Sequence, residues 1–220
     1  MSDGRQNLDP VPTLTSTEWR AAEKLFADRL PAAERYVEHL CTTGITHGLL
    51  GPREVPRMWS RHVLNSAVLG PELPSAGTVA DVGAGAGLPG VALALARPDA
   101  DFILIEPMER RVDWLDTVIR DLGLNNVQVI RSRAEDLSDE VMADVVTARA
   151  VSALKKLIPL TTPLMADDGQ LMLIKGRSAA GEISAASKQI RKARLTEPRI
   201  RLLGEGLLEE ATTVVCAQRR

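Results

Sequence analysis

The sequence predicts an α/β fold in which a mainly parallel, seven-stranded sheet carries helices on both faces and follows an N-terminal helical cap. From residue 78 onward, short apolar runs alternate with helical patterns, and this alternation is typical of a parallel sheet. A glycine-dense turn at residues 83–90 directly follows the first apolar run. The length of 220 residues, with 45% hydrophobic and 25% charged residues, allows one good core and a helical appendage.

Three regions are expected along the chain. Residues 1–14 are polar and contain prolines, which predicts a disordered leader without the basic-then-apolar layout of a signal peptide. Residues 15–72 are expected to form the helical cap, and residues 73–220 the main domain. The longest uncharged run, residues 82–96, is too short and too rich in glycine to span a bilayer. We therefore expect a cytoplasmic protein that makes no membrane contact.

The cap begins with an expected helix over residues 15–40, where apolar residues recur at helical spacing. Thr15 or Ser16 is the expected N-cap, with Glu18 as the partner in a capping box. Pro31 should break or kink this helix, because proline has no N–H and clashes with the preceding turn.

The later elements follow from the same patterns. A second cap helix is expected from Pro56, and residues 71–77 read as a linker. Beyond the linker, short apolar runs predict strands and helical periodicity predicts helices. The expected strands are 78–82, 101–106, 127–131, 143–147, 170–174, 200–203 and 212–217, and the expected helices are 88–96, 110–122, 153–165 and a basic helix at 180–193.

The glycine turn is typical of a nucleotide-binding loop. Glycine is needed where the backbone takes positive φ or approaches a ligand closely. The helix that follows offers unpaired N–H groups, and Pro89 is tolerated in its first turn. Residues 85–90 also satisfy the dinucleotide pattern G-x-G-x-x-G, with Glu106 about twenty residues beyond.

Asp81 favours S-adenosylmethionine (AdoMet) over NAD as the ligand of this loop. It stands two residues before the first glycine and completes the pattern D-x-G-x-G-x-G. AdoMet has no pyrophosphate and carries a cationic methionyl end, which an acidic residue attracts. A tight turn with only a structural role is the remaining alternative.

Functional side chains are expected just after each strand, because ligands of such sheets lie at the carboxyl ends of the strands. Glu106 can accept both ribose hydroxyl protons, unless it is an ordinary solvated acid. Residues 132–136 can read adenine through a backbone amide and an acid, although a polar turn with a helix cap would look the same. Arg149 follows the fourth strand, and Lys175-Gly176-Arg177 follows the fifth.

Six segments between residues 57 and 176 carry a resemblance to a known family. They are Arg61-His62-x-Leu64-Asn65-Ser66, Asp81-Val82-Gly83-x-Gly85-x-Gly87-Leu88-Pro89-Gly90, Arg110-Arg111-Val112-x-x-Leu115, Ser132-Arg133-x-Glu135, Arg149-Ala150 and Lys175-Gly176. In this order and spacing they resemble RsmG, once called glucose-inhibited division protein B. That family methylates N7 of a guanine in bacterial small-subunit (16S) ribosomal RNA.

The resemblance implies a Rossmann-like class I AdoMet-dependent methyltransferase with S-adenosyl-L-methionine as its cofactor. By resemblance, Arg149 and Lys175 lie near the target base and are the candidate catalytic residues. Asn65, Glu106, Arg110 and Ala148 stand where the family often has Asp, Asp, Lys and Ser, and of these only Glu106 would touch the cofactor. The full set of candidate AdoMet contacts, from the loop and the resemblance together, is Gly83, Gly85, Leu88, Glu106, Ala134, Glu135 and Arg149.

Methylation of guanine N7 agrees with what the sequence lacks. N7 carries an in-plane lone pair and no proton, so its attack on a methyl group needs alignment rather than a general base. The chain has neither the Asn/Asp-Pro-Pro-Tyr/Phe tetrapeptide of amino-directed methylases nor the Pro-Cys pair of enzymes that attack pyrimidine carbon. Arg149 or Lys175 could select guanine by reaching its O6. No metal is expected, because Cys41, Cys216 and the three histidines form no ligand pattern.

RNA binding is predicted locally, since the formal net charge is −2 and the pI about 6.0. Residues 175–201 hold eight basic and two acidic side chains, which can neutralise phosphates. Trp59 is expected near the basic helix, whereas Trp19 and Trp114 are expected in cores. For all charged candidates a solvated surface is the alternative. The candidate RNA contacts are Arg57, Arg61, His62, Arg177, Lys188, Arg191 and Lys192.

The expected partner is small-subunit ribosomal RNA, presented within the small subunit or an assembly intermediate, and no obligate protein partner is indicated. A folded particle can be recognised through few phosphate contacts. One alternative is an AdoMet-dependent methyltransferase of a small molecule or a protein. Another is a non-catalytic sensor of AdoMet or NAD, and an NAD-dependent dehydrogenase would be stabilised by NAD instead of AdoMet.

Overall fold

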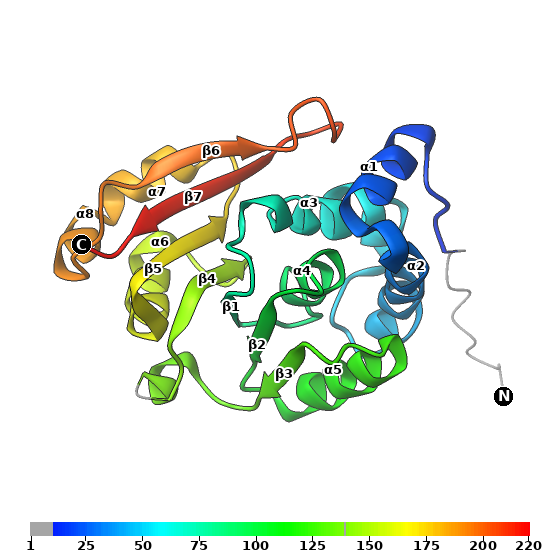
Figure 1. The fold of residues 1–220 in the computed structure, drawn as a ribbon, viewed down its shortest axis with the longest axis horizontal. Coiled ribbons are helices and arrows are strands. Elements are labelled where there is room, and N and C mark those ends of the chain that lie inside the picture. Colours follow the sequence, from blue (N-terminus) through cyan, green and yellow to red (C-terminus); the bar gives the residue numbers. More distant parts are fainter. Residues whose placement is uncertain (1–10, 139) are drawn as a thin grey trace, which may run out of the picture.

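A computed structural model describes residues 11–138 and 140–220. It contains a seven-stranded sheet in the order β3-β2-β1-β4-β5-β7-β6 (Figure 1). The first five strands pair in parallel, and β7 runs antiparallel to both β5 and β6. The predicted α/β fold is therefore confirmed. The strands are β1 Thr78–Val82, β2 Asp101–Ile105, β3 Val127–Ile130, β4 Ala143–Arg149, β5 Met165–Ile174, β6 Arg199–Leu203 and β7 Thr212–Gln218.

Helices cover both faces of the sheet (Figure 1). Neighbouring residues of β4 point to opposite faces, and accordingly Val145 packs in one core cluster and Val146 in the other. The first cluster contains α4 Gly90–Ala96, α5 Glu109–Leu122 and the cap, and the second contains α6 Leu154–Thr161, α7 Ala179–Ala185 and α8 Ser187–Lys192.

The cap begins with two helices, α1 Ser16–Phe26 and α2 Leu30–His39. Thr15 and Glu18 form the predicted capping box at the start of α1. The chain bends in a 3₁₀ turn just before Pro31, which occupies the first turn of α2, where its missing N–H costs nothing.

A π-helical turn forms the beginning of the second cap helix. This turn spans Met58–Val63 and leads into α3, Leu64–Ala67. The chain between Pro52 and Arg57 is a 3₁₀ turn, so the expected helix start at Pro56 lies inside that turn.

Two expected elements differ in extent. The helix expected over 153–165 ends at Thr161 and β5 already begins at Met165, since Pro163 has no N–H with which to extend the helix. The basic helix expected over 180–193 is divided at Ala186 into α7 and α8. Ala186 and Ile190 are both buried in the second core cluster.

The cap and the sheet share one hydrophobic core. Leu40 and Met58 of the cap belong to the same buried cluster as Leu93 of α4 and Trp114 of α5. The expected boundary between residues 72 and 73 therefore does not mark a break in the packing. We infer that the cap folds together with the sheet.

The tryptophans differ from expectation in two of three cases. Trp114 is buried as predicted, and its Nε1–H donates to Thr43. Trp59, expected near the basic helix, is 3% exposed in the first core cluster, whereas α7 and α8 pack in the second. Its indole N–H donates to the carbonyl of Pro12 over 3.2 Å. Trp19, near the start of α1, is 45% exposed and is not part of the core.

The contact with Trp59 also concerns the expected leader. Pro12 lies within residues 1–14, and Leu14 packs against the first core cluster. Residues 11–14 are thus placed against the cap, and residues 1–10 of the expected leader lie outside the described part of the chain. Among the residues that are described, no helix has the length and apolarity needed to cross a bilayer.

The shared core generates a test of cooperativity. Leu40 is fully buried where α2 ends, so Leu40→Ala should lower the free energy of unfolding by about 2–5 kcal/mol. Denaturation followed by circular dichroism and by tryptophan fluorescence should give one coincident transition that shifts as a whole. Leu202→Ala is the control, because Leu202 is 52% exposed and should change the free energy by less than about 0.5 kcal/mol. A separate early transition of the cap would contradict the inference.

Candidate active site

The glycine turn after β1 has the backbone that the sequence predicts. Gly83, Gly85 and Gly87 have φ angles of +73°, +57° and +81°, a region that disfavours residues with a side chain. Space is also restricted, since a Cβ atom on Gly87 would lie 2.5 Å from Val91 and one on Gly83 would lie 2.9 Å from Val151. The loop therefore requires glycine for both conformation and packing.

The predicted cofactor residues lie together at the carboxyl ends of β1, β2 and β3. We call this end of the sheet the cofactor edge. Val82, Ile105 and Ile130 are neighbours in register. The segments that follow them carry Gly83, Glu106 and a 3₁₀ turn over Ala134–Leu137. Leu88 and Ala134 are 8% and 6% exposed, and Glu135 is exposed. The structure thus assembles the candidate set around the end of the sheet.

Asp81 is fully buried at the end of β1. Its Oδ2 accepts a hydrogen bond from the N–H of Gly90 over 2.8 Å, and its Oδ1 has no hydrogen-bond partner among the described residues. Burial raises the pKa of Asp81 to about 7, although the Gly90 bond opposes this rise. An unpartnered buried carboxylate oxygen is costly, and a cationic ligand group would satisfy it. The residue therefore fits the methionyl end of AdoMet.

Glu106 is 1% exposed and holds the loop directly. Its Oε2 accepts from the N–H of Gly85, and its Oε1 accepts from the N–H of Met108, both over 3.0 Å. Arg111 lies 3.5 Å from Oε2. A carboxylate has about four acceptor sites, so beyond these three donors capacity remains for one ribose hydroxyl. Glu106 fits the predicted ribose contact and also braces the glycine turn.

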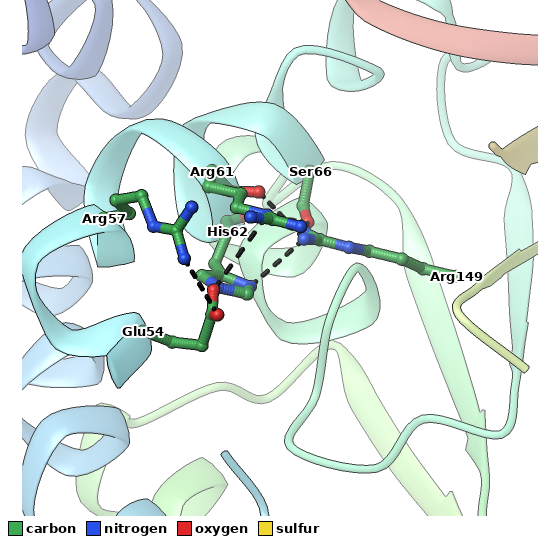
Figure 2. Close-up of polar contacts among 6 residues, drawn as sticks. All are labelled: Glu54, Arg57, Arg61, His62, Ser66 and Arg149. Carbon is green, nitrogen blue, oxygen red and sulfur yellow. Dashed lines mark hydrogen bonds and ion pairs between the residues drawn. The ribbon is translucent and has the colours of Figure 1, made fainter. Parts of the chain in front are cut away.

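Arg149 ends β4 and reaches into the cap (Figure 2). Its Nη1 donates to the carbonyl of His62 and to the Ser66 hydroxyl, each over 3.0 Å. Its Nη2 donates to the carbonyl of Arg61 over 2.8 Å and to His62 Nδ1 over 3.1 Å. Burial lowers the pKa of Arg149 to about 10, so the guanidinium stays charged at neutral pH. Both Nη atoms of Arg149 therefore donate twice to the cap, and these N–H groups are not free to bind a base.

His62 is 8% exposed and links Arg149 to Glu54 (Figure 2). Arginine only donates, so His62 Nδ1 accepts from Arg149, and Nε2 carries the proton donated to Glu54 over 2.8 Å. Burial, with the Arg149 charge, lowers the pKa of His62. The ring therefore faces the interior with both nitrogens engaged, which does not favour the RNA contact that the sequence suggests for His62. Glu54 gave no sequence signal, since its role depends on contact with a residue of the folded cap.

A pocket of about 1090 Å³ lies beside the cofactor edge, between the cap, the ends of β4 and β5, and the β6–β7 turn. Its walls include four predicted cations, Arg57, Arg61, Lys175 and Arg177, as well as Arg149. Glu18, Glu182, Glu209 and Glu210 also line it. The glycine turn is not among its walls. The pocket is therefore adjacent to the cofactor edge and distinct from it.

Lys175 is placed in this pocket at the end of β5. Its Nζ lies 2.8 Å from Glu182 Oε2 and donates to the carbonyl of Ser152 over 2.9 Å. An ammonium has three N–H donors, so one remains beyond these two contacts. Its side chain is 11% exposed, and Lys175 is one of the residues that line the pocket.

The remaining predicted basic residues are not brought to the pocket. Lys188, Arg191 and Lys192 are exposed on α8 and do not line it. The chain after α8 leads to Leu195, which pairs with Arg219 beside Gly169 near the start of β5. The three α8 cations therefore form a surface separate from the pocket, toward the amino-terminal half of β5.

Metal ligands are not grouped in the part of the chain that the structure describes. No set of three His, Cys, Asp or Glu residues there could hold an ion. Cys41 and Cys216 are both free, and burial raises the pKa of the Cys41 thiol to about 11.

Solved structures share the fold. One is TYW2 of M. jannaschii in complex with AdoMet, with a TM-score of 0.54 and 20% identity over 73% of this chain and 76% of that one. Another is precorrin-6y C5,15-methyltransferase of Geobacter metallireducens, with a TM-score of 0.54 and 12% identity over 71% of this chain and 88% of that one. The fold is therefore that of the class I AdoMet-dependent methyltransferases.

Sequence comparison gives the family. Residues 29–210 match the family model described as rRNA small subunit methyltransferase G, GidB. The relative of that name in Pseudarthrobacter chlorophenolicus is 60% identical over 92% of this chain and 94% of its own length. Its counterpart in Thermobifida fusca is 45% identical over 89% of this chain and 82% of its own length. AdoMet is the cofactor, and the chain belongs to the rRNA small subunit methyltransferase G family.

Proposed function

We propose that this protein transfers the methyl group of AdoMet to N7 of one guanine in bacterial 16S ribosomal RNA. The observation that carries the proposal is the cation-lined pocket next to the cofactor edge of the sheet. A base held in that pocket would lie beside the ends of β4 and β5. The pocket also has walls from the cap, which can hold the neighbouring phosphates.

The chemistry needs position more than proton transfer. Bound AdoMet supplies an electrophilic methyl group on a sulfonium. Guanine N7 supplies a lone pair and loses no proton, so no side chain has to act as a base. Alignment of two reactants can contribute up to ~7–11 kcal/mol to lowering a barrier. We therefore assign the residues of this site to binding and orientation.

The cofactor contacts proposed here lie at the ends of the first three strands. Asp81 faces the cationic methionyl end, and Glu106 accepts a hydrogen bond from the ribose. Glu135 and the backbone of Ala134 read adenine. Support comes from the orphaned Asp81 Oδ1, the buried Glu106 carboxylate and the common edge on which these residues meet. The close backbone approach to the ligand is assigned to Gly83, Gly85 and Leu88.

Lys175 is the stronger of the two candidates for the contact with guanine O6. Among the described residues, one N–H donor of Lys175 has no acceptor. Arg149, in contrast, makes four hydrogen bonds to the cap. We therefore assign Lys175 to the target base and Arg149 to holding the pocket wall in place. Arg149 also lies close enough to Asp81 to lower the pKa of that carboxyl, so Arg149 remains a candidate AdoMet contact.

The proposed RNA path begins at the pocket. Arg57, Arg61 and Arg177 are exposed there and can neutralise phosphates. Lys188, Arg191 and Lys192 would meet a more distant part of the RNA. The net charge of −2 gives little general attraction, which favours a folded target in the small subunit or an assembly intermediate. Such a substrate places the reaction in the cytoplasm.

Methylation of purified particles tests the function. Small subunits from cells that lack this protein should gain a single 7-methylguanosine when incubated with the protein and labelled AdoMet, as mapped by mass spectrometry. Deproteinised 16S RNA should be the poorer substrate, because a folded particle presents the base. Equal rates on both would refute the particle substrate. Binding of AdoMet without methylation of the RNA would refute the acceptor.

Substitution of Lys175 tests the base contact. Lys175→Ala should lower kcat/KM for the small subunit about 5- to 150-fold, which corresponds to the ~1–3 kcal/mol of a specific base contact. The Kd for AdoMet should stay unchanged. Lys155→Ala is the matched control, since Lys155 is an exposed lysine on α6 outside the pocket. Equal activity of the two variants would remove Lys175 from the site.

The Asp81 carboxyl predicts a pH dependence of AdoMet binding. Its pKa in the fold is raised to about 7, so it loses its charge as the pH falls through that value. The Kd for AdoMet should therefore rise about tenfold between pH 8 and 6, equivalent to ~1.4 kcal/mol. Titration calorimetry on Asp81→Asn should give weak binding without this dependence. Asp144→Asn changes a carboxylate at the opposite end of β1 and should keep it.

A further inference from the structure

Tyr36 connects the cap to the cofactor loop. It is fully buried on α2, with Ala33, Val37 and Leu40 on the same face of the helix. Its hydroxyl donates to the carbonyl of Ala86, in the middle of the glycine turn, over 2.6 Å. We infer that Tyr36 is a positioning residue for AdoMet, which it serves by fixing the backbone of the glycine turn.

The hydrogen bond acts on a peptide whose orientation matters. Because a peptide unit is planar, holding the Ala86 carbonyl also fixes the direction of the Gly87 N–H. That N–H donates to the carbonyl of Ala84 over 2.7 Å and closes the turn. Glu106 holds the turn on its other side through the N–H of Gly85. Tyr36 and Glu106 therefore restrain neighbouring peptides from different parts of the chain.

Packing adds to the restraint. A Cβ atom built on Gly87 would lie 3.0 Å from the Tyr36 hydroxyl, so the tyrosine closes the space behind the turn. Glycine-rich turns have several backbone conformations of similar energy. A buried side chain that satisfies one carbonyl favours the single conformation in which that carbonyl points at it. The turn then meets its ligand already in the binding conformation, which lowers the entropic cost of binding.

Its surroundings keep the hydroxyl a donor. Burial holds the pKa of Tyr36 well above its ordinary value, and the nearby Asp81 charge acts in the same direction. Arg149 acts in the opposite direction. Asp81 and Arg149 both lie near the carboxyl ends of sheet strands, so Tyr36 of α2 lies where the cap meets those strand ends.

Direct binding of AdoMet tests the inference without RNA. Tyr36→Phe removes the hydroxyl and leaves a buried carbonyl unpartnered, and titration calorimetry should show a Kd for AdoMet about tenfold higher, equivalent to ~1.4 kcal/mol. KM for the small subunit should not change. Thr161→Val is the matched control, because it also removes a fully buried hydroxyl, here one bonded within α6. Whatever stability the control loses, its Kd for AdoMet should stay within about twofold of wild type.

The outcomes separate this inference from the proposed function. If Tyr36→Phe and Thr161→Val lose similar stability and both keep the wild-type Kd, the hydroxyl is only structural and the inference is overturned. If wild type binds AdoMet tightly and methylates no ribosomal RNA, the proposed acceptor fails and the Tyr36 inference can still hold.

A second measurement covers a variant that does not fold. Tyr36 is the single tyrosine of the chain, so biosynthetic 3-fluorotyrosine gives one ¹⁹F resonance that needs no assignment. Titration of the full chain with AdoMet should shift this resonance with the Kd measured by calorimetry. A resonance that stays unchanged at saturation would contradict the coupling between Tyr36 and the cofactor loop.

Discussion

The contact between the Arg149 guanidinium and the cap is the interaction on which the rest of the site depends. Taking a cation out of water is costly unless hydrogen bonds replace the lost hydration. Here the carbonyls of Arg61 and His62, the Ser66 hydroxyl and the His62 ring replace it. These acceptors all belong to one stretch of the cap, so the charge is satisfied only when that stretch is docked on β4. The wall of the pocket is therefore stable only in the complete fold.

The cap thereby serves two neighbouring sites. Through Tyr36 it holds the glycine turn, and through Arg57 and Arg61 it lines the pocket. The shared hydrophobic core makes both roles compatible, since α2 and the segment before α3 pack on α4 and α5 as one body. A cap that moved independently would lose the buried contacts of Tyr36 and Arg149 together. The glycine turn and the pocket wall thus depend on the same contact surface between cap and sheet.

Burial separates the roles of the basic residues, which the sequence alone treats alike. Arg149 and His62 are engaged inside the protein, Lys175 lies at the pocket wall, and the α8 cations lie on another surface. By sequence, Arg149 and Lys175 were candidates for the target base, and His62 and the α8 cations were candidates for other RNA contacts. Exposure and committed hydrogen bonds distinguish them, because a donor that is already used cannot also select a base.

The sequence by itself determined the sheet, the glycine turn and the family, because local patterns encode them. Alternating apolar runs predicted all seven strands, and the Asp81-to-Gly90 pattern predicted where the backbone needs positive φ. Tertiary structure alone decided that His62 is buried, that Glu54 pairs with it, that Trp59 packs inward and that Tyr36 reaches Ala86. Each of these contacts depends on where a helix docks. Docking is set by the summed packing of residues far apart in sequence, which no local pattern records.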